Sequence, residues 1–166
     1  SGNYIQAKAD PASVYAMLRI ELATGGGLPT AKVLDVVRLE KDTSLPAFGT
    51  SPFGFRIRRL RFLSGVVAAV EEIWLDGHFA KEILASELSE SLYLFYRQKL
   101  GLWIARAQDS VGQGPLPDWA PQDFPHQPQT PLPLITRISW DANGQSVELS
   151  KTWYDPTNVR YVARLN

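Results

Sequence analysis

Four arginines fall within six positions of the segment RIRRLRFLSG, residues 56–65. Because side chains alternate across a strand, Arg59 and Arg61 would share one face with apolar neighbours, while Arg56 and Arg58 would share the other. Two adjacent guanidiniums on a partly buried face need anionic partners, since an unpaired buried charge is very costly. A guanidinium fork fits phosphate and carboxylate oxygens. The segment therefore indicates either an anion-binding site or a solvated edge strand with surface ion pairs.

Glu71 is the candidate carboxylate partner of these arginines, because it lies in the apolar run VVAAVEEIWL, residues 66–75. A three-residue loop between the two strands would place Arg59 opposite Glu71. A two-residue turn made by Ser64-Gly65 would instead place Arg58 opposite Glu71. Both registers are open at this point, and a purely structural cross-strand Arg–Glu pair is the alternative to a ligand site.

Ser91 and Tyr93 open a predicted helix, SLYLFYRQKL at 91–100, with Gly101 just past its end. The N-terminus of a helix offers free N–H groups and a partial positive charge, and both favour bound anions. Ser91 also fits an ordinary N-cap, and Tyr93 fits ordinary amphipathic packing. Glu148 alternates with apolar neighbours in the chain, so it faces either a polar pocket or solvent.

The 166 residues carry 17 Lys+Arg and 17 Asp+Glu, so the formal net charge is zero. This balance argues against a surface built to bind nucleic acid. The chain has no cysteine, which excludes disulfides and thiolate metal sites. His78 and His126 lack metal-ligand spacing, and no catalytic triad order or phosphate-cradling glycine loop occurs. We expect no enzyme activity, no metal and no cofactor.

No apolar run approaches the roughly 18 residues of a membrane span, so we expect a cytoplasmic protein without membrane contact.

Turn and capping residues divide the chain into short elements. Asp10-Pro11 begins a predicted helix that Gly25-Gly26-Gly27 ends, and AKEILA predicts a short helical turn. Seven of the twelve prolines lie in 115–133, which predicts an ordered but irregular loop. The predicted strands and hairpins are 31–41, 55–63, 66–75, 102–107, 132–154 with an Asn143-Gly144 turn, and 159–165.

Four motifs in this order resemble one family, the UTRA ligand-sensing domain of GntR-type transcriptional regulators of the HutC subfamily. The resemblance covers almost the whole chain. The matching segments are LPTAKVLDV (28–36), RRLRFLSGVVAAVEE (58–72), SLYLFYRQKLGLWIARA (91–107) and ITRISWDANGQSVELSKTWY (135–154).

This resemblance implies an α+β fold like that of chorismate lyase: an antiparallel sheet of about six strands with helices packed on it. It also implies a homodimer and a small anionic effector, such as a sugar phosphate, a carboxylate or a phosphonate. The ligand-binding residues that it implies are Arg59, Arg61, Ser91 and Tyr93 around the anion, Glu71 and Glu148 on polar groups of the effector, Tyr161 or Tyr154 as a wall, and Ser13 as the hydroxyl near the first helix.

The resemblance also implies a domain organisation. Residues 1–9 are expected to be a tag remnant and linker, and 10–166 the UTRA-like domain. The family's N-terminal winged helix-turn-helix has no counterpart in this sequence, so DNA would be bound only through that missing domain. The alternative function is a chorismate lyase-type enzyme acting on a small aromatic or enolpyruvyl acid. Whether the proline-rich loop closes the pocket or the dimer is open.

Overall fold

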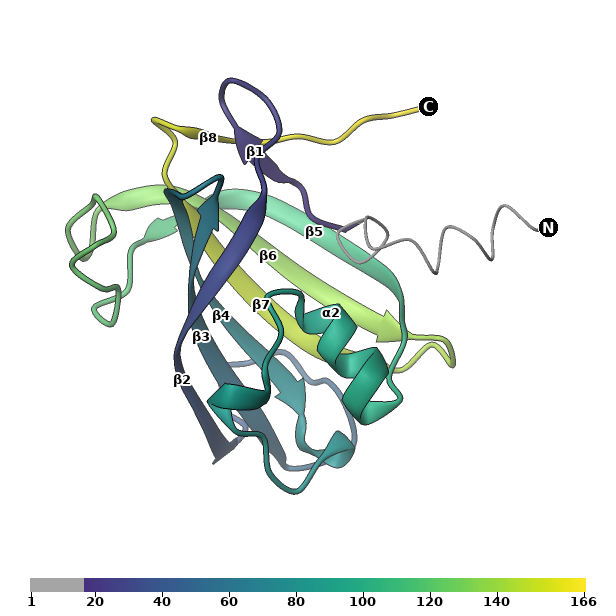
Figure 1. The fold of residues 1–166 in the computed structure, drawn as a ribbon. Helices are drawn as coiled ribbons and strands as arrows, with labels where there is room; N and C mark the ends of the chain where they lie inside the picture. Colours follow the sequence, from purple (N-terminus) through teal and green to yellow (C-terminus); the bar gives the residue numbers. More distant parts are fainter. Residues whose placement is uncertain (1–16) are drawn as a thin grey trace.

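A computed structural model describes residues 17–166 of this chain as a curved antiparallel sheet with a short ribbon at one end (Figure 1). The six-stranded sheet has the order β2-β3-β4-β7-β6-β5, and β1 pairs with β8 in a separate two-stranded ribbon. The strands are β1 (Ile20–Leu22), β2 (Pro29–Glu40), β3 (Phe53–Leu63), β4 (Val66–Asp76), β5 (Ile104–Pro115), β6 (Pro131–Asp141), β7 (Ser146–Tyr154) and β8 (Val159–Tyr161).

The helical elements are short. Two 3-10 turns, η2 (Gly77–Phe79) and η3 (Ala85–Glu87), precede α2 (Leu92–Phe95), which continues as the π-helical turn η4 (Tyr96–Leu100). Gly101 ends this helix in the left-handed conformation, with φ 64°. The predicted helix over 91–100 and the predicted α+β class with a six-stranded antiparallel sheet are confirmed. No described helix is long and apolar enough to cross a membrane.

The first predicted helix is wrong over its described part. Residues 10–16 lie outside the described residues, but Ile20–Leu22 is strand β1 and pairs with β8. The helix prediction used the helical spacing of Met17, Leu18 and Leu22. Leu18, Ile20 and Leu22 also recur at every second position, which is the period of a strand. The glycines at 25–27 form the turn into β2, where all three have positive φ.

Three smaller boundaries also differ from the predictions. The helical turn predicted at 80–85 is absent over 80–84: η2 ends before that segment, and η3 begins only at its last residue, Ala85. The last strand ends at Tyr161 rather than at 165. β5 starts at Ile104 and continues to Pro115, because it pairs with β6 along the whole length of that strand.

Both faces of the sheet are covered. On one face, α2 and η4 pack through Leu92, Phe95 and Tyr96 on Ile57 and Ile73. The opposite face is covered by the proline-rich loop, with the buried cluster Leu60, Val70, Leu116, Phe124, Leu132 and Trp153. This loop therefore does not lie on the helix face of the sheet.

The β1–β8 ribbon covers the other end of the helix face. Ile20 and Val159 pack there on Leu63, Ala69 and Ile135. The helix and the ribbon thus bury two separate apolar patches on the same side of the sheet (Figure 1). The strand positions between the two patches carry polar side chains.

A β-bulge sets the register of the arginine hairpin. Ser64 and Gly65 form a two-residue turn with φ of 48° and 78°, and Leu63 pairs with Val66. The register shifts after this start and leaves Ala68 without a partner on β3, so Arg59 pairs with Glu71. The expectation that a tight turn would place Arg58 opposite Glu71 is wrong, because the bulge adds one residue to β4. Arg58 pairs with Glu72 instead.

Candidate functional site

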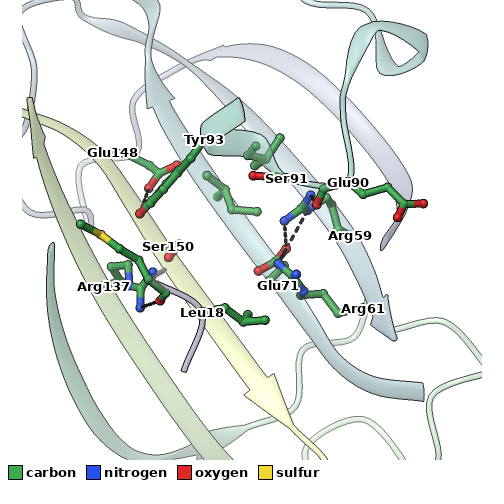
Figure 2. Close-up of a pocket in the computed structure, with 13 residues that line it drawn as sticks. Leu18, Arg59, Arg61, Glu71, Glu90, Ser91, Tyr93, Arg137, Glu148 and Ser150 are labelled. Atoms are coloured by element: carbon green, nitrogen blue, oxygen red, sulfur yellow. Dashed lines mark hydrogen bonds and ion pairs between the residues drawn. The ribbon is translucent and has the colours of Figure 1, made fainter. Parts of the chain in front are cut away.

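A small cavity of about 80 Å³ lies on the helix face of the sheet, between the N-terminus of α2 and the start of the ribbon (Figure 2). Strands β3, β4, β6 and β7 supply its floor. Its lining residues are Met17, Leu18, Arg59, Arg61, Glu71, Ile73, Glu90, Ser91, Leu92, Tyr93, Arg137, Glu148 and Ser150.

Strand register explains why polar side chains meet at this cavity. Ile73 pairs with Ser150, Ser150 with Arg137, and Arg137 with Asp109, so these side chains form one row across four strands. The neighbouring row on β3 and β4 carries the Arg59–Glu71 pair. Since side chains at alternate positions share a face, the two rows place charges from distant parts of the chain on one floor.

Arg59, Arg61 and Glu71 form a buried charged cluster. Their exposed fractions are 3%, 8% and 6%, so none of the three is solvated like a surface charge. Glu71 Oε1 accepts from Arg59 Nε at 2.6 Å and from Arg61 Nη1 at 3.4 Å, and Arg59 Nη2 lies 2.5 Å from the same oxygen. Burial opposes ionisation of Glu71, but the two guanidiniums lower its pKa below the ordinary value. The solvated edge strand is therefore excluded.

Arg59 also connects the sheet to the helix. Its Nη1 donates at 3.2 Å to the backbone carbonyl of Glu90, which directly precedes the N-cap residue of α2. Ser91 is the N-cap of that helix, and its Oγ accepts from the backbone N–H of Leu94 at 3.3 Å. The same guanidinium thus positions both Glu71 and the start of the helix beside the cavity.

Glu148 lies at the other side of the cavity among hydroxyl groups. Its carboxylate accepts hydrogen bonds from Tyr96, from Ser139 Oγ at 2.9 Å and from Tyr93 at 3.4 Å. Tyr93 and Ser139 also bond to each other at 3.0 Å. Burial raises the pKa of Glu148 more than the hydrogen bonds from Tyr96 and Ser139 lower it. Burial, followed by the nearby Glu148 charge, raises the pKa values of both tyrosines.

Arg137 is a cavity residue that the sequence analysis did not select. Its Nε and Nη2 donate to the two carboxylate oxygens of Asp109 at 2.6 and 2.9 Å, and Nη2 also donates to the carbonyl of Met17 at 2.6 Å. Burial opposes ionisation of Asp109, but Arg137 lowers its pKa. The sequence could have indicated Arg137, because Ile135, Arg137 and Ser139 occupy alternate positions of a predicted strand and therefore share one face. Ser150 on the next strand extends this polar face.

Six of the eight predicted site residues line the cavity together: Arg59, Arg61, Glu71, Ser91, Tyr93 and Glu148. Tyr161 is not among the lining residues, and its hydroxyl donates to Asp109 Oδ2 at 2.8 Å, behind Arg137. Tyr154 packs in the apolar cluster under the ribbon. Ser13 lies outside the described residues. The binding roles of all eight stay predictions.

The charges of this site suit an anion. Three guanidiniums, from Arg59, Arg61 and Arg137, line the cavity together with the carboxylates of Glu71, Glu90 and Glu148. The pKa of Glu71 is lowered by Arg59 and Arg61. Glu148 is held closer to its neutral form. A bound anion would accept charge-assisted hydrogen bonds from these guanidiniums. Within residues 17–166, no group of three or more His, Cys, Asp or Glu side chains is arranged to hold a metal ion.

Comparison with known proteins identifies the family of this chain from its sequence and relates its fold to solved structures. The model of the UTRA domain family matches residues 25–160. Over 165 residues the chain is 53% identical to the HTH-type transcriptional regulator SmoD of Agrobacterium fabrum, covering 99% of this chain and 70% of that protein.

Two solved structures share the fold at low sequence identity. One is a ligand-binding domain from Bordetella bronchiseptica assigned to a GntR-family transcriptional regulator, with a TM-score of 0.73, 20% identity, and coverage of 90% of this chain and 97% of that chain. The other is the effector domain of PhnF from Mycobacterium smegmatis, with a TM-score of 0.66, 19% identity, and coverage of 84% and 88%.

Two neighbouring ion pairs of the arginine hairpin should differ sharply in their contribution to stability. Glu71→Gln leaves two buried guanidiniums without their carboxylate, and we expect a loss of about 3–5 kcal/mol in the free energy of unfolding. Glu72→Gln removes the half-buried partner of Arg58 and should cost at most about 1 kcal/mol. Urea denaturation of both variants measures the difference, and equal losses would contradict a buried charge cluster.

Glu148 should make stability depend on pH in the direction opposite to Glu71. Its pKa in the folded chain is raised above the ordinary value of 4.5, so its contribution is complete below that value and is lost as pH rises. The wild type should therefore lose stability relative to Glu148→Gln as pH increases from 4.5. Denaturation of both proteins over a pH series checks this, and a difference that does not vary with pH would refute it.

Proposed function

This chain belongs to the UTRA domain family, whose members serve as ligand-sensing domains of GntR-type transcriptional regulators, and we propose that it senses a small anionic metabolite. The effector would be a sugar phosphate, a carboxylate or a phosphonate. Its anionic group would bind to Arg59 and Arg61 near Ser91 at the start of α2. Tyr93, Glu71, Glu148 and Arg137 would contact its other polar groups.

One observation carries this proposal: two buried guanidiniums beside a cavity share a single carboxylate oxygen. Here Arg59 and Arg61 converge on Oε1 of Glu71 while they also line the cavity. An effector anion would be a further acceptor for this pair, in surroundings where water screens charge poorly and a charge-assisted hydrogen bond is strong.

The proposed output is control of DNA binding in the full regulator. A winged helix-turn-helix domain of the HutC type would be attached upstream, and the regulator would act in the cytoplasm as a homodimer. The similarity to SmoD over 99% of this chain supports this role, because SmoD is an HTH-type transcriptional regulator. Effector binding would shift the population of conformations and thereby the DNA affinity. The same similarity favours sensing over the lyase-type enzyme as the function.

We expect Arg61→Ala to abolish most of the stabilisation that the effector gives. Each charge-assisted hydrogen bond to the anion is worth about 1.5–3 kcal/mol, which corresponds to a loss of roughly 10- to 100-fold in affinity. A thermal-shift screen of sugar phosphates, phosphonates and carboxylates identifies the effector with the wild type, because a ligand of the native state raises its melting temperature. The same ligand is then titrated against the variant.

Arg58→Ala is the matched control, since Arg58 lies on the same strand but pairs with Glu72 on the opposite face. It should keep the affinity of the wild type. The assignment of the anion to this site is wrong if Arg61→Ala binds the effector as tightly as Arg58→Ala does. Arg59→Ala serves as a second site variant, although it also removes the hydrogen bond to the Glu90 carbonyl.

A further inference from the structure

Residues 17–19 form a short segment without regular secondary structure that leads directly into β1. We call it the entry strap. Met17 and Leu18 line the main cavity, and they also line a neighbouring cavity of about 70 Å³. The two cavities share Arg61, Glu71, Arg137 and Ser150. The entry strap therefore borders two adjacent cavities, and a ligand that filled both would touch it.

The two ends of the entry strap are held differently. At its downstream end, the carbonyl of Arg19 accepts from the backbone N–H of Val162 at 2.7 Å, and β1 then pairs with β8. At its upstream end, the carbonyl of Met17 accepts from Arg137 Nη2 at 2.6 Å. The downstream end thus belongs to a backbone ladder, whereas the carbonyl of Met17 at the upstream end is bound by a side chain that lines the cavity.

The Arg137–Asp109 pair connects this upstream end to the ribbon as well. Asp109 holds Arg137 through two hydrogen bonds and accepts a third from the hydroxyl of Tyr161 on β8. Arg137 therefore contacts the cavity, the entry strap and, through Asp109, the ribbon. Figure 2 shows Arg137 beside Leu18 and Ser150, across the cavity from Arg59.

We propose that the entry strap is a gate, which opens at Met17 to admit the effector and is held closed by the effector once it is bound. This inference rests on the proposed sensing function. A ligand that touches Met17, Leu18 and Arg137 at the same time binds only the closed form tightly, so it shifts the population toward that form. Since the strap carries the chain into the domain from its N-terminal side, its position would report occupancy to the residues that precede it.

The chain offers a specific probe for this gate, because Met17 is the only methionine among its 166 residues. Labelling with [methyl-¹³C]methionine gives one NMR signal that reports on the strap. Without ligand, Arg137→Gln should move this signal toward the position of free methionine and narrow it, because the upstream anchor is lost. Arg106→Gln is the matched control, since Arg106 is an exposed arginine of β5 that stacks on Trp140, and it should leave the signal unchanged.

Tyr161→Phe provides a milder variant in case Arg137→Gln does not fold. It removes only the hydroxyl that bonds to Asp109, and it should shift the Met17 signal in the same direction by a smaller amount. The gate is refuted if the Met17 signal of a folded Arg137→Gln, or of Tyr161→Phe where Arg137→Gln does not fold, coincides with that of the wild type.

A titration with inorganic phosphate tests the ligand side of the gate. The Met17 signal should move away from the free-methionine position, with the same midpoint as the rise in melting temperature. A rise in melting temperature without any change at Met17 would overturn the gate and leave the anion site intact. If phosphate has no effect on the wild-type melting temperature, that result counts against an anionic effector. The Met17 signals of the wild type and the variants without ligand then decide whether the entry strap is a gate.

Discussion

One carboxylate oxygen, Oε1 of Glu71, holds two buried guanidiniums, and the geometry of the cavity depends on this contact. An unpaired charge at this depth would cost several kcal/mol, so the three side chains are stable only together. Their meeting requires the bulge at Ala68, because this extra residue places Glu71 opposite Arg59. Arg59 then binds the carbonyl before α2, which fixes the helix start over the same cavity.

The sheet can carry a polar floor because its apolar side chains are buried in separate clusters on either side of that floor and on the opposite face. The helix packs on one apolar patch and the β1–β8 ribbon on another, while the proline-rich loop protects the opposite face of the sheet. The strip between helix and ribbon is thereby free to carry arginines, carboxylates and hydroxyls. Its cations and anions come from β3, β4, β5, β6 and β7, so strand register is what assembles the site.

Much of this arrangement was predictable from the sequence. Alternation separated Arg59 and Arg61 from Arg56 and Arg58, and the N-cap at Ser91 located the helix. The bulge was not predictable, because Val66 to Val70 are uniformly small and apolar, and no residue type marks where one is added. Strand β1 was missed because Met17, Leu18 and Leu22 fit helical spacing, while Leu18, Ile20 and Leu22 fit period two. Arg137 was overlooked because its partners, Asp109 and Met17, lie far away in the chain.

The most direct measurement of the central claim is a crystal structure of this domain with the effector found by screening. The anionic group of the effector should lie within hydrogen-bonding distance of both Arg59 and Arg61, next to the start of α2. Glu71 should remain bonded to Arg59 from its side of the cavity, and Met17 and Leu18 should contact the remainder of the ligand. An effector bound elsewhere on the domain, with this cavity unchanged, would contradict the account.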